Sequence, residues 1–189
     1  MKRIAIIGDI GSGKSYVAKQ FGYPVFNADL EVNKIYKNNK KCFNKLKKTF
    51  PKYISSFPIQ KKEIFDLILK KKNSIKKINN IVHPEVRLKM KSFLKNNKKK
   101  KIVVLDIPLL LEGKINNKKD ILIYVYGDKK KIKKKLEKRS NFNKKIYNKL
   151  KKLQLPLEAK KKKSDFIIKN NFKHTYVKKS VNNILKKFK

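Results

Sequence analysis

The sequence predicts an α/β fold, in which helices flank a parallel β-sheet. Strand-like and helical segments alternate along much of its 189 residues, and this alternation is typical of sheets wound by right-handed crossovers. Two strand segments, residues 3–7 and 102–107, are almost entirely apolar, as in strands that are buried on both faces. A chain of this length with 40% hydrophobic residues can bury one core. We therefore expect a single domain over residues 1–189.

The predicted elements follow one another without an internal repeat or a linker rich in Gly, Ser or Pro. Strands are expected at residues 3–7, 25–26, 102–107, 121–125 and 164–168. Helices are expected at residues 14–21, 129–139, 143–153 and 176–188. The stretch from residue 31 to about 101 has a mostly helical pattern, interrupted at Pro51, Pro58 and Pro84. It is too long for a plain crossover, so we expect it to form a helical subdomain.

Lysine dominates the charge of this chain. The 54 Lys and Arg against 13 Asp and Glu give a net charge of +41, and the only arginines are Arg3, Arg87 and Arg139. Such a charge suggests nucleic acid as a partner. Proteins that recognise a specific nucleic-acid sequence, however, rely on arginine for bidentate contacts, and arginine is rare here. The lysines are also spread along the chain. Compositional drift is therefore favoured over a specific nucleic-acid partner. Nonspecific, salt-dependent binding to polyanions is still expected.

The single cysteine, Cys42, excludes a disulfide framework and a four-cysteine metal site, and it indicates a reducing compartment. The apolar run after the N-terminal Met-Lys-Arg is too short for a signal peptide, and residues 102–111 contain Asp106 and Pro108 and are too short to span a membrane. We expect a cytoplasmic protein without a membrane partner, and a monomer is favoured.

Residues 8–15 read Gly-Asp-Ile-Gly-Ser-Gly-Lys-Ser and fit the phosphate-binding pattern G-x-x-x-x-G-K-[ST]. A buried strand precedes the loop and a helix follows it, as this function requires. Glycines let backbone N–H groups surround phosphate oxygens, and the helix N-terminus adds its dipole. Lys14 supplies charge to the β- and γ-phosphates, and the Ser15 hydroxyl suits Mg²⁺. We therefore expect a P-loop fold whose nucleotide contacts are Gly8, Gly11, Ser12, Gly13, Lys14, Ser15 and Tyr16.

Two aspartates follow predicted strands, whose carboxyl ends should share one ligand-binding edge of the sheet. Asp29 can accept the proton of an attacking hydroxyl, or it can simply cap the helix that starts near Leu30, and position alone leaves both roles open. Asp106 ends a segment similar to Walker B, in which the aspartate holds Mg²⁺ through water. An ordinary turn acid fits this position as well. Glu112 follows near the same edge.

Several segments together resemble the dephospho-coenzyme A (dephospho-CoA) kinase family over nearly the whole chain. The loop is shared by many nucleotide enzymes, but the other motifs in this order are specific. The segments are residues 8–15 (family G-G-I-G-S-G-K-S), 25–29 (VFNAD for V-I-D-A-D), 83–87 (HPEVR for H-P-x-V-R), 107–112 (IPLLLE for I-P-L-L-F-E), and Gln154 with 164–170 (SDFIIKN for A-D-x-V-I-x-N).

The resemblance implies a nucleotide-kinase-like P-loop fold with a five-stranded parallel core. It also implies a helical substrate-binding insertion at residues 30–98 and a mobile lid at residues 129–153. The implied reaction is transfer of the ATP γ-phosphate to the ribose 3′-hydroxyl of dephospho-CoA, which yields coenzyme A and ADP in the final step of coenzyme A synthesis. ATP is then the co-substrate and Mg²⁺ the cofactor.

The resemblance also assigns roles to single residues. Asp29 corresponds to the catalytic base and contacts the substrate, and Arg139 corresponds to a lid arginine that stabilises the transferring charge beside Lys14. His83, which from the sequence alone is better explained by helix capping and packing, would by this resemblance line the coenzyme A side of the cleft with Arg87. Expected Mg²⁺ ligands are Ser15 and Asp106.

The chain departs from the family pattern at three positions. Asp9 stands where glycine is preferred and places a negative charge beside the triphosphate, Asn27 replaces the first acid of D-A-D, and Lys135 replaces a second lid arginine. Two other functions are considered. One is a small P-loop kinase that acts on another nucleoside or nucleotide, and the other is a basic nucleic-acid-binding protein with a vestigial P-loop.

Overall fold

The computed structural model describes residues 1–140 and 142–188. The chain forms two compact units, and each is described by itself. The first unit comprises Met1–Asn27 and the chain from Asn97 onward, and the second comprises Ala28–Asn96.

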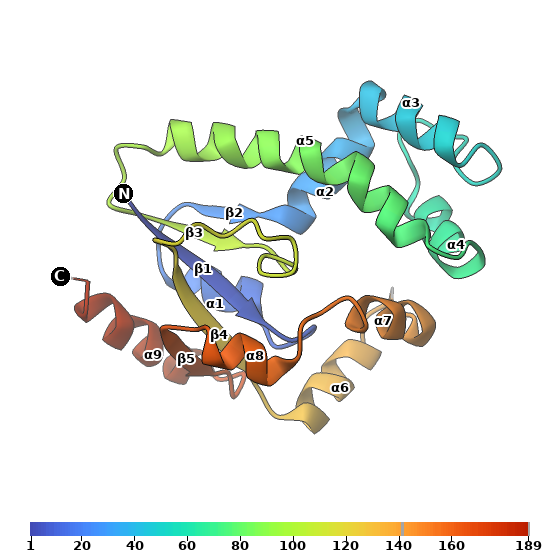
Figure 1. Cartoon of the computed structure of the whole chain (residues 1–189). Helices are drawn as coiled ribbons and strands as arrows, with labels where there is room; N and C mark the ends of the chain where they lie inside the picture. The colour runs from blue at the N-terminus through green and yellow to red at the C-terminus, as the bar shows by residue number, and fades with distance from the viewer. Residues whose placement is uncertain (141, 189) are drawn as a thin grey trace. The chain divides into compact units, whose positions relative to one another are not determined.

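The first unit is built on a five-stranded parallel sheet (Figure 1). Its strands are β1 (Lys2–Gly8), β2 (Val25–Asn27), β3 (Ile102–Asp106), β4 (Ile121–Tyr126) and β5 (Phe166–Lys169). They lie in the order β2-β3-β1-β4-β5, and all four neighbouring pairs are parallel. The α/β fold with a five-stranded parallel sheet is therefore confirmed. In the register, Asn27 pairs with Asp106 and Gly8 pairs with Val125, so the carboxyl ends of four strands meet at one edge.

Helices pack on this sheet because successive side chains of a strand point to opposite faces, and in β1 and β3 the side chains on both faces are largely apolar and buried. The helices of the first unit are α1 (Lys14–Gln20), α6 (Lys129–Glu137), α7 (Lys144–Lys151), α8 (Leu157–Lys162) and α9 (His174–Lys186). Helices α1 and α9 contact each other and the sheet, and α8 contacts β1. The main core lies between the sheet and helices α1 and α9, and includes Ile4, Ile6, Val17, Val104, Ile123, Val125, Ile168, Val177 and Val181. Sequence patterning missed α8, which has only six residues.

The second unit is helical. It contains α2 (Ala28–Asn38), α3 (Lys40–Thr49), α4 (Lys61–Lys70) and α5 (Ser74–Asn96), and α5 contacts the other three. Pro51 and Pro58 lie between helices, as expected, but Pro84 lies inside α5, so the expected interruption there is wrong. The buried side chains Ile78, Val82, Val86 and Met90 recur every four residues along α5. Their packing holds the helix together although proline lacks a backbone donor.

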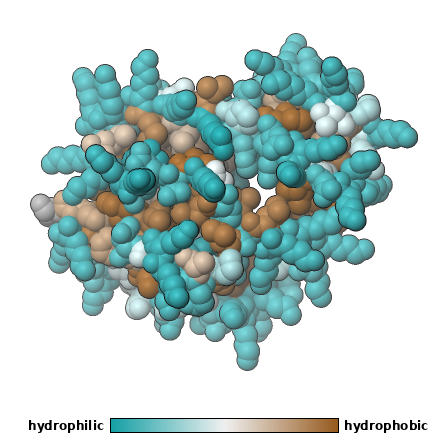
Figure 2. Space-filling model, viewed as in Figure 1, coloured by the Kyte–Doolittle hydropathy of each residue, from teal (hydrophilic) through white to brown (hydrophobic). Residues whose placement is uncertain are grey.

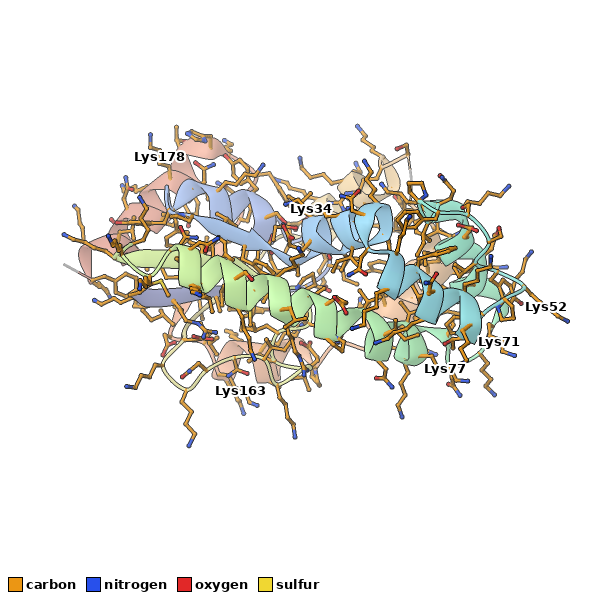
Figure 3. The ribbon with its side chains drawn as sticks, turned by 90° about the horizontal axis from the view of Figure 1, so that it is seen from above. Lys34, Lys52, Lys71, Lys77, Lys163 and Lys178 are labelled. Atoms are coloured by element: carbon orange, nitrogen blue, oxygen red, sulfur yellow. The ribbon has the colours of Figure 1, made fainter. Side chains whose placement is uncertain are left out.

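The lysine excess is exposed to solvent and is not gathered in one segment. Figure 2 shows hydrophilic residues over most of the visible face. Figure 3 labels lysines on several elements of both units: Lys34, Lys52, Lys71, Lys77, Lys163 and Lys178. Among the described residues, no helix is long and apolar enough to cross a membrane.

Candidate phosphate-binding and catalytic site

The glycine loop lies between β1 and α1, and its backbone requires glycine at three positions. Gly8 has a φ of 149°, and a Cβ atom there would overlap the backbone carbonyl oxygen of Val125. Gly11 and Gly13 have φ values of 81° and 86°, in the left-handed region that side chains disfavour. A Cβ atom on Gly13 would overlap the side-chain amide of Asn170. A Cβ atom on Gly11 would lie 2.9 Å from Leu136 of α6. The loop is therefore enclosed by the segment after β5 on one side and by α6 on another.

Lys14 and Ser12 are the buried polar side chains of this loop. Lys14 is 9% exposed, and its Nζ donates a hydrogen bond of 2.7 Å to the backbone carbonyl of Asp9, so the side chain folds back across the loop. The Ser12 hydroxyl is buried and has no hydrogen-bond partner within the described part of the chain. Ser15 and Tyr16 are exposed at the start of α1, and the Tyr16 hydroxyl lies 2.9 Å from His174 Nδ1.

Asp9 is part of the loop structure. Its Oδ1 accepts a hydrogen bond of 2.7 Å from the backbone N–H of Ile10, and its carbonyl accepts one of 3.3 Å from the N–H of Ser12. Burial, and then the negative charge of Asp9, raise the pKa of Tyr124 on β4. The departure at position 9 thus places a carboxylate on one N–H group of the loop itself.

Asp106, Asn27 and Ser15 lie together at the carboxyl edge of the sheet. Asp106 ends β3 and is 2% exposed. The Asn27 side-chain nitrogen donates a hydrogen bond of 2.6 Å to Asp106 Oδ2 and lies 3.5 Å from Ser15 Oγ. The two expected Mg²⁺ ligands, Ser15 and Asp106, therefore both place an oxygen within 3.5 Å of the same Asn27 nitrogen.

This donor set fits Mg²⁺. The ion prefers oxygen ligands and is usually bound by one or two carboxylates together with substrate phosphates and water. Asp106 and Ser15 supply a carboxylate and a hydroxyl next to the glycine loop. Within the described residues, no group of three or more His, Cys, Asp or Glu is placed to form a metal cage of its own. The remaining ligands would have to come from the nucleotide and water.

Asp29 lies in the first turn of α2, in the second unit. The helix begins at Ala28 and not near Leu30, so Asp29 is its second residue. The capping alternative for Asp29 is therefore wrong, because the residue that directly precedes the helix is Asn27 and not Asp29. A carboxylate in the first turn still interacts favourably with the positive end of the helix dipole.

His83 and Arg87 lie one helical turn apart on α5, also in the second unit. His83 is partly buried and Arg87 is exposed. Burial, and then the positive charge of Arg87, lower the pKa of His83 below its ordinary value. The imidazole is therefore neutral near pH 7, and it can act as a hydrogen-bond partner without adding to the positive charge.

Arg139 follows α6, and its side chain is exposed. Its backbone N–H donates to the carbonyl of Leu136, the residue of α6 that contacts the glycine loop. Lys135 of the same helix places its Nζ 4.7 Å from the centre of the Phe172 ring, which is a cation–π contact. The segment expected to form a lid includes residue 141, which lies outside the described residues.

Asn170, which follows β5, is a functional candidate that single-residue reasoning missed. It is 1% exposed, its Nδ2 donates 2.9 Å to the carbonyl of Ser12, and its Oδ1 accepts from the N–H of Phe172. It therefore ties the glycine loop to the segment after β5. The available signal was the family motif, which ends in asparagine at this position.

A second group missed by the sequence is a buried ion pair. Lys160 Nζ on α8 lies 2.8 Å from Glu112 Oε1, and the same oxygen accepts 2.9 Å from the N–H of Leu155. The pair ties the segment after β3 to α8 and to Leu155, just after the expected lid segment. In the sequence, Glu112 stands out by its position near the catalytic edge and as the last residue of the 107–112 motif.

The comparisons with known proteins concern the family and the fold. The family model described as dephospho-CoA kinase matches residues 2–175. A dephospho-CoA kinase of Wolbachia pipientis is 34% identical over 187 residues, covering 96% of this chain and 95% of the relative. A crystal structure from Thermus thermophilus aligns with a TM-score of 0.80 at 25% identity, over 100% of this chain and 98% of the other. A dephospho-CoA kinase from Campylobacter jejuni shares the fold, with a TM-score of 0.65 at 22% identity, over 100% and 98% of the two chains.

Sequence motifs, sheet topology and the phosphate-binding loop therefore lead to the same assignment, and the family model spans most of the chain. This chain belongs to the dephospho-CoA kinase family.

Proposed function

We propose that this protein transfers the γ-phosphate of ATP to the ribose 3′-hydroxyl of dephospho-CoA, which yields coenzyme A and ADP. The observation that carries the proposal is the cluster of Lys14, Ser15 and Asp106 around the glycine loop of a chain that belongs to this family. The free, buried Cys42 agrees with a reducing, cytoplasmic setting.

ATP binds at the glycine loop in this proposal. Backbone N–H groups of the loop contact phosphate oxygens, and Lys14 leaves the Asp9 carbonyl to pair with the β- and γ-phosphates. The remaining nucleotide contacts are those expected from the sequence: Gly8, Gly11, Ser12, Gly13, Ser15 and Tyr16. Ser15 and Asp106 would hold Mg²⁺, which supplies positive charge to the phosphate oxygens.

Asp29 acts as the base. As the ribose oxygen forms its bond to the γ-phosphorus, the bond from that phosphorus to the leaving oxygen of ADP breaks, and the hydroxyl proton passes to the Asp29 carboxylate. Arg139 stabilises the charge on the phosphoryl group during transfer. His83 and Arg87 line the substrate side, where a neutral imidazole and a guanidinium suit hydroxyl and phosphate groups.

The sharpest test of this proposal is Asp29→Asn. Loss of the base should lower kcat by about 10²- to 10⁴-fold. ATP affinity should change little, because Lys14 and the loop carry it. A matched control is Glu31→Gln, which neutralises another acid in the first turn of α2. If kcat of Asp29→Asn stays within a few-fold of Glu31→Gln, Asp29 is not the base.

The acceptor is tested separately from the base. Release of ADP is measured with dephospho-CoA and with a panel of nucleosides and nucleoside monophosphates. Turnover with dephospho-CoA should exceed turnover with every other acceptor. A nucleoside or nucleotide as the best acceptor would overturn the substrate assignment and leave a P-loop kinase of another specificity.

A further inference from the structure

Asn27 lies at the edge of the sheet, next to the buried Asp106 carboxylate and the Ser15 hydroxyl. It is the last residue of β2 and pairs in register with Asp106, the last residue of β3. Its side-chain nitrogen lies 2.6 Å from Asp106 Oδ2 and 3.5 Å from Ser15 Oγ. Both groups are oxygen acceptors, and the nitrogen faces the two of them.

The chemistry of an amide suits this position. The nitrogen of asparagine carries two hydrogens, so it can donate to both oxygens at once. Asp106 is 2% exposed, and a buried carboxylate needs donors to offset its lost hydration. An aspartate at position 27 would offer only acceptors when ionised, and it would place a second negative charge against Asp106.

We propose that Asn27 is a positioning residue, which holds the Asp106 carboxylate and the Ser15 hydroxyl in place before a divalent cation and nucleotide arrive. The inference rests on the proposed function in that Asp106 and Ser15 are the cation ligands. In this chain the Asn27 amide supplies hydrogen bonds to both groups. With aspartate at position 27, that carboxylate and the Asp106 carboxylate would need the cation to offset their mutual repulsion.

A structural role in capping α2 makes a different prediction. Asn27 directly precedes Ala28, the first residue of α2, and asparagine, aspartate and serine are all favoured caps. A capping role therefore leaves Asn27→Asp close to the wild type. The positioning role makes Asn27→Asp dependent on a cation, because aspartate caps a helix but cannot donate to Asp106.

The first experiment compares melting temperatures of the full chain in EDTA and in millimolar MgCl₂, without nucleotide. Asn27→Asp should melt at least about 4 °C below the wild type in EDTA and recover most of this loss in Mg²⁺. The wild type should shift by less than about 1 °C between the two conditions. The control is Asn183→Asp, which makes the same charge change at an exposed residue of α9. If Asn27→Asp melts like Asn183→Asp in both conditions, the proposal is wrong.

The second experiment uses Asn27→Ala and Asn27→Ser. Loss of the amide should raise the Mg²⁺ concentration for half-maximal turnover by at least about 5-fold and leave the affinity for ATP in EDTA unchanged. Serine keeps one donor and should restore part of this loss. An unaltered Mg²⁺ dependence in Asn27→Ala would overturn the proposal. The melting experiment needs neither dephospho-CoA nor turnover, so it decides this inference even if the proposed acceptor is wrong.

Discussion

Replacing Lys160 by methionine removes one half of the ion pair that is buried in the first unit. The Lys160 side chain is 1% exposed and that of Glu112 is 11% exposed, with 2.8 Å between Nζ and Oε1. After the change, Glu112 keeps the hydrogen bond from the N–H of Leu155 but loses its counter-charge. Breaking a buried pair in this way costs about 3–5 kcal/mol. For a chain of this size, that lowers the melting temperature by about 6–20 °C.

The assay is urea denaturation at pH 7, with a double-mutant cycle. Glu112→Gln alone should also be strongly destabilising, whereas Lys160→Met with Glu112→Gln should lose less than the sum of the two, because no unpaired charge remains buried. Lys161→Met is the matched control, since it changes the exposed neighbour in the same helix. A Lys160→Met variant within about 1 kcal/mol of Lys161→Met would refute the reasoning.

Two further predictions concern the loop and the helical unit. Gly13→Ala and Gly22→Ala both place alanine at a positive φ, which costs about 1–2 kcal/mol in each variant. Of the two added Cβ atoms, only the one at Gly13 meets Asn170. Titration calorimetry should therefore show a loss of at least about 10-fold in ATP affinity for Gly13→Ala and not for Gly22→Ala. Equal affinities in the two variants would show that the Asn170 contact is unimportant. Burial opposes ionisation of Glu63, but hydrogen bonds from residues 55–60 outweigh it and lower its pKa from 4.5 to about 2. The stabilisation is therefore full above pH 4.5 and is lost as the pH falls through about 2. Glu63→Gln should cost about 1–2 kcal/mol at pH 7, discounted for partial exposure, and much less near pH 2, as measured by urea denaturation. An equal loss at both pH values would contradict this.

Much of the fold was predictable because it depends on local patterns. Almost entirely apolar segments identified β1 and β3, which are buried on both faces, and the spacing of glycines with Lys14 identified the loop between β1 and α1. The error at Pro84 has a tertiary cause, since packing along α5 outweighs the lost backbone donor. Local rules cannot weigh a missing hydrogen bond against contacts with three other helices.

The candidate site was less accessible to sequence reasoning, because its contacts depend on strand register. The sequence places Asn27 and Asp106 far apart, and only the parallel pairing of β2 with β3 brings them opposite each other. The departure from the family motif at Asn27 was visible from the start. The structure was needed to see the consequence of this departure, which is that the Asn27 amide donates a hydrogen bond to the buried Asp106 carboxylate.

The few acids of this lysine-rich chain are placed where the backbone needs an acceptor. At least six of the 13 carboxylates accept a hydrogen bond from a backbone N–H group: Asp9, Glu63, Glu112, Asp120, Asp128 and Asp165. A lysine cannot accept a hydrogen bond, so a drift towards lysine at these positions would leave N–H groups without a partner. On the exposed surface, water solvates an additional lysine and salt screens its charge. Selection against the loss of acceptors therefore explains how the charge of the chain can rise to +41 while turns, caps and loops of both units keep their carboxylates.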